Sequence, residues 1–340
     1  MPGNSTGSGS RGEHLAGPAA AGSEPPGRRD EPAVTVVIVT RNRCALLLES
    51  LAAVSDQARP PDCVIVVDNA STDDTVASVR AKFPEVRIAG LPSNTGGAGG
   101  FAYGLALALA SGADLIWLMD DDTIPAPEAL AALLDARSRW PGRRPALIAS
   151  RVLWTDGREH PMNTPRAKPF ATAAERAAAA AIACLPIRSA SFVSVLIDAA
   201  VCRQRGLPVA DYFLWADDFE FTTRILRGNQ GLLCPDSVVV HKKATFGAAV
   251  TNPGPRFFYE VTNKIWTLRS RSALAAHERV LYGGATLRRW ARTFARSGDR
   301  RGLARSLASG LAAGLRTRPR PTEEVFAAVG VALPGRDTSG

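Results

Sequence analysis

Between residues 34 and 119 the sequence alternates short apolar runs with segments of helix length, and this alternation constrains the fold more than any other feature. The runs of strand character are Val34–Val39, Val64–Val67, Val86–Leu91 and Leu115–Met119. The first two are apolar on both faces and rich in β-branched residues, as is typical of strands buried in a parallel sheet. Strands that alternate with helices at short intervals form parallel βαβ units. We therefore predict an α/β fold with a Rossmann-like, mostly parallel sheet flanked by helices.

The two ends of the chain differ in composition from its middle. Residues 1–32 are rich in Gly, Ser, Pro, Ala and Arg and have almost no large apolar side chains, which predicts a disordered N-terminal tail. A similar composition predicts a flexible C-terminal tail over 317–340. Between the tails we expect a folded domain over 33–270, followed by a helical extension over 271–316.

Basic residues are concentrated near the C-terminus. The chain has 41 Lys and Arg against 32 Asp and Glu, a net charge of +9, and arginines are dense in 269–320. Leucines and aromatic residues lie among these arginines, which predicts a pair of basic amphipathic helices over 278–316. Such a pair would lie on an anionic membrane surface, or it would cover the sheet and keep its arginines in water.

Several sequence features bear on the location of the protein. The N-terminus lacks the apolar run of a secretory signal, and the longest apolar segment, Leu105–Met119, is interrupted by Ser111, Gly112 and Asp114. The five cysteines form no CxxC pair, which argues against a disulfide framework and against a structural zinc site. We expect a cytoplasmic protein, with peripheral contact at the inner face of the cell membrane as an option.

Three aspartates, Asp120, Asp121 and Asp122, directly follow the fourth apolar run. Adjacent carboxylates repel one another unless a cation offsets their charge. Alternate residues of an extended chain point the same way, so Asp120 and Asp122 can face one ion. Oxygen ligands suit Mg²⁺ or Mn²⁺. The alternative is a solvated turn that caps the next helix, but the position after a buried strand favours the metal site.

Polar residues also follow the first two runs, namely Thr40-Arg41-Asn42 and Asp68-Asn69. In open α/β sheets, ligands bind outside the carboxyl ends of the strands. All three polar groups are therefore expected at one ligand-binding edge.

A glycine-rich segment, Asn94–Gly100, is expected to form a turn before a helix over 101–110. Gly97, Gly99 and Ala102 match a relaxed dinucleotide fingerprint, which keeps a dehydrogenase open as an alternative. That fingerprint belongs to the first βα turn, whereas two βα units precede this one. Close backbone approach to a nucleotide or a sugar explains the glycines equally well.

The second half of the chain has another acidic pair, Asp217-Asp218, at an expected helix start, and His241 follows an apolar strand. A carboxylate near a sugar can remove the proton of an attacking hydroxyl. Equally, acidic residues stabilise a helix N-terminus through the helix dipole, and a lone histidine is more often a core or surface residue than a ligand. Neither feature alone distinguishes a functional role from a structural one.

Together these segments resemble the family 2 glycosyltransferases, which have the GT-A fold. The ordered matches are Val36–Asn42, Val66–Asp73, Asn94–Gly100, Asp120–Asp122, Ala216–Glu220 and His241. The sequence is most similar to the actinobacterial galactofuranosyltransferases, through Asn94–Phe101, Trp117–Asp122 and Arg256–Tyr259. Rhamnosyltransferases are close relatives within the family.

The resemblance implies a role for each matched position. It divides the domain into a nucleotide-binding half over 33–125 and an acceptor half over 126–270. The implied donor nucleotide site comprises Thr40, Arg41, Asn42, Asp68, Asn94, Gly97, Asp120 and Asp121. The implied ligands of Mn²⁺ or Mg²⁺ are Asp120, Asp122 and His241. The implied general base is Asp218, with Asp217 as the alternative, and we assign Trp215 and Glu220 to acceptor binding.

The resulting hypothesis is an inverting, metal-dependent glycosyltransferase of cell-envelope polysaccharide synthesis. Its favoured donor is UDP-galactofuranose, and its acceptor is a glycan or a lipid-linked glycan. The alternatives are a rhamnosyltransferase that uses dTDP-rhamnose, a nucleotidyltransferase, and a basic nucleic-acid-binding module. The clustered acids would repel nucleic acid, so we expect no nucleic-acid partner.

Overall fold

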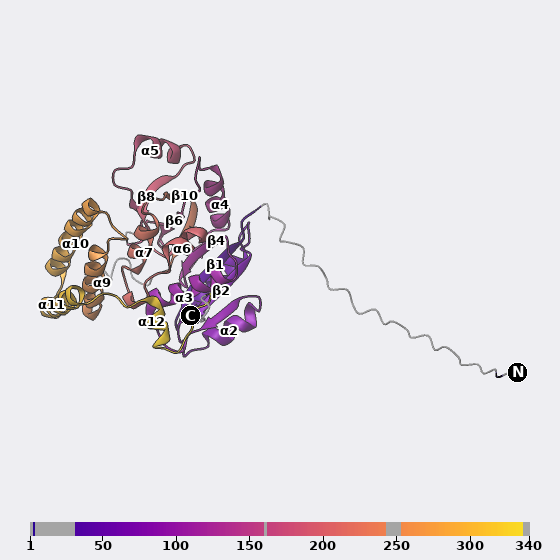
Figure 1. Ribbon diagram of the computed structural model, residues 1–340, viewed down its shortest axis with the longest axis horizontal. Helices are drawn as coiled ribbons and strands as arrows, with labels where there is room; N and C mark the ends of the chain where they lie inside the picture. The colour runs from indigo at the N-terminus through magenta and orange to yellow at the C-terminus, as the bar shows by residue number, and fades with distance from the viewer. Residues whose placement is uncertain (1–2, 4–30, 160–161, 243–252, 336–340) are drawn as a thin grey trace. The chain divides into compact units, whose positions relative to one another are not determined.

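The computed structural model describes residues 3, 31–159, 162–242 and 253–335. Most of the predicted tail over 1–32 therefore lies outside the described residues. From Ala33 onward the chain forms one compact unit, in which the sheet lies between helices and the group α9, α10 and α11 packs beside it (Figure 1).

The described residues contain a mixed, mostly parallel sheet, as predicted. Its strands are β1 (Val34–Thr40), β2 (Cys63–Asp68), β3 (Arg87–Gly90), β4 (Leu115–Asp120), β5 (Thr123–Pro125), β6 (Leu147–Leu153), β7 (Arg166–Ala167), β8 (Leu185–Ser189), β9 (Ser194–Asp198) and β10 (Gly231–His241). Their order is β3-β2-β1-β4-β9-β6-β10-β8-β7, with β5 paired to β10. Strands β1 to β4 run parallel to their neighbours in this series, as do β6 and β10, whereas β9 is antiparallel to β4 and β6.

Helices cover both faces of the sheet. They are α1 (Cys44–Ser55), α2 (Thr75–Lys82), α3 (Gly96–Ala110), α4 (Ala129–Arg139), α5 (Ala173–Ala180), α6 (Ala199–Arg205), α7 (Asp217–Ile225), α9 (Phe257–Arg269), α10 (Ala276–Arg296), α11 (Arg300–Arg316) and α12 (Thr322–Ala327). Along β1, Val36 and Ile38 pack with α1 and α4, whereas Val37 packs with α3. Both faces of this strand are therefore buried, which explains its continuous apolar sequence.

The glycine-rich segment differs from the predicted turn, because α3 already begins at Gly96. A Cβ atom at Gly100 would lie 2.4 Å from Cγ1 of Val39, and one at Gly104 would lie 2.3 Å from Cγ1 of Val37. These glycines are required because α3 packs directly against the side chains of β1, with no room for a methyl group.

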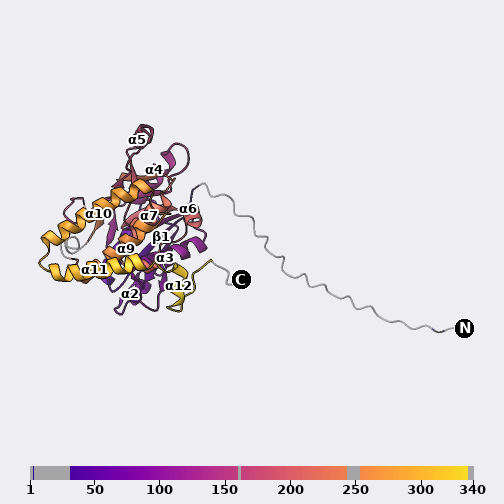
Figure 2. The same ribbon diagram turned by 60° about the vertical axis from the view of Figure 1, so that its left-hand side comes forward.

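The predicted amphipathic helices are α10 and α11, which form the two arms of a V (Figure 2). They pack on α9, where Trp290 and Leu303 are buried against Phe257 and Val261. Glu278 at the start of α10 also forms a buried ion pair with Arg188 of β8. Among the described residues, no helix combines the length and the apolarity needed to cross a bilayer.

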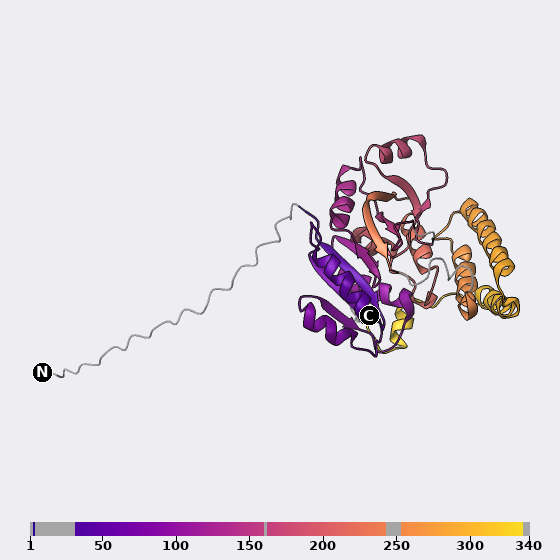
Figure 3. The same ribbon diagram turned by 180° about the vertical axis from the view of Figure 1, so that it is seen from behind.

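Composition predicts a flexible tail over 317–340, but its described part, residues 317–335, contains a helix that packs on the domain. Helix α12 lies within it, Phe326 is fully buried, and its ring packs 5.5 Å from the ring of Tyr103 on α3. Figure 3 shows this C-terminal helix beside the N-terminal half of the sheet. Low average hydrophobicity conceals the segment's two anchoring residues, Val325 and Phe326.

Candidate active site

The polar strand ends of β1, β2 and β4 meet at one edge of the sheet. Thr40 pairs with Asp68 across β1 and β2, and Val39 pairs with Asp120 across β1 and β4. The Thr40 hydroxyl donates a 2.8 Å hydrogen bond to Asp121 Oδ2. The predicted convergence of these three strand ends is confirmed.

Asp121 is held inside the protein. Its carboxylate accepts hydrogen bonds from Thr40 and from Arg43 Nη1, the latter at 3.0 Å. Burial raises the pKa of Asp121 to about 6, and the Arg43 guanidinium opposes this shift. Arg43 also donates to Asp122 Oδ2 at 2.7 Å. Sequence reasoning missed Arg43, although it lies in the same strand-end turn as Arg41 and Asn42.

The strand β10 brings His241 to the aspartates. His241 is fully buried, and its Nε2 lies 2.9 Å from Asp122 Oδ1 and 3.8 Å from Asp120 Oδ2. One ligand atom from each of the three residues lies within 4.8 Å of the others. His241, which is 119 positions beyond Asp122 in the sequence, thus joins the two aspartates in one cluster, with the composition that the resemblance implies for a metal site.

The donor chemistry of this cluster fits a divalent cation. His241 Nδ1 lies 3.0 Å from Asn163 Oδ1, so a neutral imidazole with its proton on Nδ1 would donate to Asn163 and present the Nε2 lone pair to a cation. Nε2 lies 2.9 Å from Asp122 Oδ1, so these two atoms can bind one ion. Adjacent corners of an octahedral Mg²⁺ shell are about 3 Å apart, which matches this spacing. Asn163, which sequence reasoning missed, fixes the tautomer that a ligand needs.

The turns after β1 and β2 are tied together. Thr72 N donates to Asn42 Oδ1 at 2.7 Å, and Asn42 N donates to Ser71 Oγ at 2.9 Å. Asp68 is buried and accepts from the backbone of Ser71. Asn42 adopts φ 53°, a left-handed conformation that the mutual hydrogen bonds stabilise. Arg41 is exposed at the same turn.

A second clamp joins β2 to α3. Asn69 Nδ2 donates to the carbonyl of Gly96 at 2.8 Å, and Asn69 Oδ1 accepts from Thr95 N at the same distance. Asn94 is exposed beside this clamp, and a Cβ atom at Gly97 would meet open space. Asn94 and Gly97 thus border the strand-end edge as predicted, while the buried Asn69, left out of the predicted site residues, fixes the start of α3.

The loop before α7 has unusual backbone geometry. Phe213, Trp215 and Ala216 all have φ between 57° and 66°, a region that residues other than glycine rarely adopt. The buried Asn263 of α9 donates from Nδ2 to the carbonyls of Tyr212, Leu214 and Trp215 at 2.8–2.9 Å. These bonds offset the cost of the strained conformation, which is about 1–3 kcal/mol for each residue.

The same loop packs on the start of α3. Ala98 N donates to the carbonyl of Phe213 at 3.3 Å, and a Cβ atom at Gly96 would lie 2.0 Å from that oxygen. Gly96 itself has φ 73°, which glycine adopts without strain. The strained loop therefore places Asp217 and Asp218 beside the glycine-rich start of α3.

Only one of the two carboxylates of this loop lines the adjoining cavity. Asp218 faces the cavity together with Trp215, Arg166 and Lys264, whereas Asp217 lies outside its lining. Burial raises the pKa of both carboxyls, and the charge of Asp120 raises both further. A raised pKa suits a carboxylate that accepts a proton during a reaction. This geometry favours Asp218 over Asp217 as the group that meets an acceptor.

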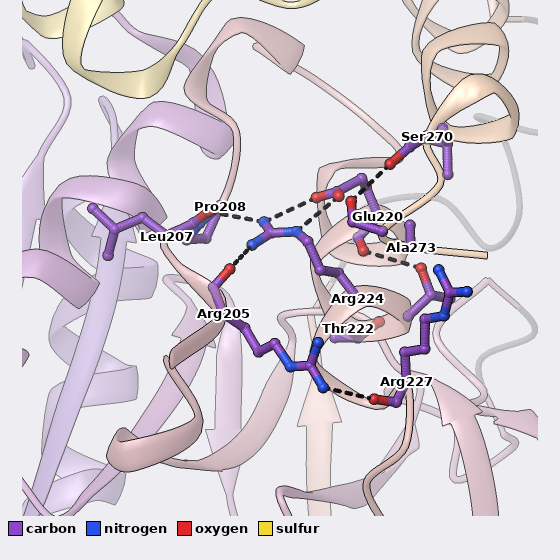
Figure 4. A network of polar contacts seen from close by, with 12 residues as sticks. Arg205, Leu207, Pro208, Glu220, Thr222, Arg224, Arg227, Ser270 and Ala273 are labelled. Carbon is purple, nitrogen blue, oxygen red and sulfur yellow. Dashed lines mark hydrogen bonds and ion pairs between the residues drawn. The ribbon is translucent and has the colours of Figure 1, made fainter. Parts of the chain in front are cut away.

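The two predicted acceptor residues have different surroundings. Trp215 lines the cavity with Asp218, as expected. Glu220 does not: its carboxylate pairs with Arg224, with Nε–Oε1 at 2.9 Å and Nη2–Oε2 at 3.1 Å. Arg224 also donates to the carbonyls of Arg205 and Leu207, and Glu220 lines a separate cavity (Figure 4). Glu220 is therefore a structural ion-pair partner that locks α7, because its position in the helix turns it away from Asp218.

Comparison with known proteins identifies the domain. The family model described as Glycosyl transferase family 2 matches residues 35–141. Residues 35–141 are therefore similar to the family 2 glycosyltransferases. The galactofuranosyltransferase GlfT1 of Mycolicibacterium smegmatis is 46% identical over 101 residues, which cover 30% of this chain and 33% of that protein. GlfT1 of Mycobacterium tuberculosis strain H37Rv is 46% identical over 91 residues, which cover 26% of this chain and 30% of that protein. The match thus spans about a third of these relatives.

Solved glycosyltransferase structures share the fold. Residues 1–349 of S. aureus TarS in complex with UDP-GlcNAc have a TM-score of 0.55 and 16% identity, over 86% of this chain and 83% of that one. GalNAc-T7 with UDP, GalNAc and Mn²⁺ has a TM-score of 0.51 and 12% identity, over 76% and 55% of the two chains. The likeness confirms the predicted GT-A fold, with a helical C-terminal region.

Proposed function

We propose that the protein is an inverting, metal-dependent glycosyltransferase that transfers galactofuranose from UDP-galactofuranose to a glycan or lipid-linked glycan of the cell envelope. One observation carries the proposal: Asp120, Asp122 and His241 gather within 4.8 Å at the strand-end edge. They lie near Asp218, whose pKa is raised by burial and also by the charge of Asp120. Such a site brings a donor diphosphate and a proton acceptor together.

The donor is held by the strand-end turns. Thr40, Arg41, Asn42 and Asp68 border the nucleoside, and Asn94 and Gly97 border its far side. A Mn²⁺ or Mg²⁺ ion held by Asp120, Asp122 and His241 would neutralise charge that develops on the diphosphate. Asp121 binds Arg43 and Thr40 and keeps the flanking aspartates in position.

The reaction is a single displacement. Asp218 takes the proton of an acceptor hydroxyl while that oxygen bonds to the anomeric carbon of the donor sugar. The bond from that carbon to the diphosphate breaks, and the nucleoside diphosphate leaves with the bonding electrons. Attack opposite the leaving group inverts the anomeric configuration.

A donor panel tests this function. Purified protein with Mn²⁺ and an acceptor glycan is given UDP-galactofuranose, UDP-galactopyranose, UDP-GlcNAc or dTDP-rhamnose, and nucleoside diphosphate release is measured. We expect the highest rate with UDP-galactofuranose. A higher rate with dTDP-rhamnose would replace the donor assignment, and pyrophosphate release from a nucleoside triphosphate would indicate a nucleotidyltransferase instead.

We also propose peripheral contact with an anionic membrane through α10. Val280 and Leu287 project from its outer face with 78% and 65% of their surface exposed, beside a row of arginines. Exposed apolar residues beside basic ones are typical of interfacial helices.

Point substitutions test the membrane contact better than deletion, because deletion of the C-terminus would remove the buried Phe326. We expect Val280→Ser with Leu287→Ser to weaken sedimentation with vesicles of phosphatidylcholine and phosphatidylglycerol. The exposed pair Ala304→Ser and Ala308→Ser on α11 is the control. Equal sedimentation of both variants and the wild type would contradict the contact.

A further inference from the structure

A second cavity, of about 320 Å³, adjoins the one that Asp218 lines. It lies between β7, α9 and α10, and we call it the basic cavity. Its cationic lining residues are Arg166, Lys264, Arg288, Arg289, Arg292 and Arg296. Among the described residues that line it, none is a carboxylate. So many cations around one hollow repel each other unless an anion binds there.

The two cavities share part of their lining. Arg166, Phe219, Lys264, Arg289 and Thr293 line both of them. A ligand that extends across this shared wall can therefore place a neutral hydroxyl at Asp218 and an anionic group among the arginines. The shared wall links the basic cavity to the proposed acceptor site.

Protein carboxylates neutralise little of this charge. Arg289 pairs with Glu260, which also accepts from Trp290 Nε1 at 3.3 Å. Within the described chain, the side chains of Arg288, Arg292 and Arg296 form no hydrogen bond or ion pair with another residue. Their charges are therefore available to a ligand.

Lys264 is the most enclosed of the six cations. It is only 7% exposed, and its Nζ lies 3.9 Å from the centroid of the Phe219 ring. The Arg166 guanidinium lies 5.3 Å from the same centroid. Burial, Arg289 and Arg166 together lower the pKa of Lys264 to about 8, and Glu260 and Asp218 oppose this shift. An ammonium group in this position is stabilised by a bound anion.

We propose that the basic cavity binds a phosphoryl group, a phosphate or a diphosphate, that is carried by the acceptor. The proposal rests on the proposed function, because it assigns one end of the acceptor of that same site. A carboxylate carries a single charge, whereas a diphosphate offers several oxygens to the planar forks of Arg292 and Arg296 and to the ammonium of Lys264. The phosphoryl group positions the acceptor hydroxyl at Asp218.

Binding of inorganic diphosphate without divalent metal tests the cavity itself. Isothermal titration at physiological ionic strength compares wild type with the double variant Arg292→Gln, Arg296→Gln. The control is Arg301→Gln, Arg305→Gln, which removes the same charge from exposed positions of α11. We expect the first variant to bind diphosphate at least about tenfold more weakly, since charged hydrogen bonds contribute about 1.5–3 kcal/mol each, and the control to bind like wild type. Equal weakening in both variants, or no binding by wild type, overturns the proposal.

Transfer kinetics test whether the phosphoryl group that binds in the basic cavity belongs to the acceptor. The same glycan is offered as a lipid diphosphate, as a soluble diphosphate and without phosphate. We expect Arg292→Gln, Arg296→Gln to raise KM for both phosphorylated acceptors and to leave kcat/KM for the unphosphorylated glycan unchanged. A rise confined to the lipid-linked form shows that the arginines bind a membrane surface and overturns the cavity assignment. If no nucleotide-sugar is turned over while diphosphate still binds in the cavity, the proposed function fails and the anion site remains.

Discussion

The strand-end edge and the α9–α11 region have opposite chemistries. At the strand-end edge, buried aspartates are held by Thr40, Arg43 and His241, and every turn is tied by side-chain hydrogen bonds. In the α9–α11 region, Arg288, Arg292 and Arg296 surround a hollow without partners in the described chain. The family match over 35–141 includes the aspartates of the first region and no residue of the second. Under the proposed function, the edge would bind the donor and the helical region the acceptor.

The largest expected effect is at the boundary between the two regions. Asp218→Asn should lower kcat by about 10²–10⁴-fold, the usual contribution of a general base, and leave the Kd for donor unchanged. The matched variant is Asp217→Asn. The Asp217 carboxylate lies outside the cavity lining, so its loss should lower kcat less. Rates and donor affinity are measured in parallel. If Asp217→Asn loses more turnover than Asp218→Asn, the roles of the two are reversed.

The strand-end edge is probed through its histidine. His241→Gln should abolish Mn²⁺-dependent donor binding, and Asn163→Ala, which removes the partner of Nδ1, should weaken it by about 10–100-fold. Metal affinity is measured directly by titration with Mn²⁺ and electron paramagnetic resonance. Wild-type Mn²⁺ affinity in His241→Gln would contradict the ligand assignment.

The loop that joins the two regions depends on Asn263. Asn263→Ala leaves three carbonyls without their donor and should lower the free energy of unfolding by about 1–3 kcal/mol. Ala216 has a left-handed backbone conformation that glycine adopts without strain. Ala216→Gly should therefore restore about 0.4–1 kcal/mol of the free energy of unfolding in the Asn263→Ala variant. Denaturant unfolding of the two single variants and the double variant measures these changes in the free energy of unfolding. A destabilising Ala216→Gly would show that the loop is not strained.

The smallest expected effects come from alanine substitutions at two glycines of the helical region. One glycine is packed against a neighbouring helix, and the other is exposed. A Cβ atom at Gly310 of α11 would lie 2.8 Å from Val261 Cβ, so Gly310→Ala should cost about 1–3 kcal/mol by overpacking. Gly284 of α10 has open space around it, so Gly284→Ala should stabilise by about 0.5–1 kcal/mol through helix propensity. Thermal unfolding distinguishes them, and equal effects would contradict the packing of α11 on α9.

The sequence predicted those parts of the site that depend on local pattern. Asp68 and Asp120 follow strands that are apolar on both faces, and position after such a strand determines which edge they occupy. His241 could be assigned only through the family resemblance, because nothing local shows that β10 ends beside β4.

The roles of other residues could not be predicted from the sequence, because they depend on contacts between distant segments. Asn163 and Asn263 act through contacts with segments 48 or more residues away, and an isolated asparagine has no distinguishing neighbours. Glu220 was assigned to acceptor binding from the sequence. Its ion pair with Arg224 could not be predicted, because the spacing on a helix does not say which face meets the cavity. The basic cavity joins β7, α9 and α10, which only the tertiary structure brings together.

The central claim is that the metal cluster and Asp218 form one inverting transferase site. The direct measurement follows the product of UDP-galactofuranose and an acceptor glycan by NMR, with Mn²⁺ and after chelation. The account predicts one new glycoside of inverted anomeric configuration, formed in equal amount to UDP and lost on chelation. Retained configuration, or transfer that persists without a divalent ion, would contradict it.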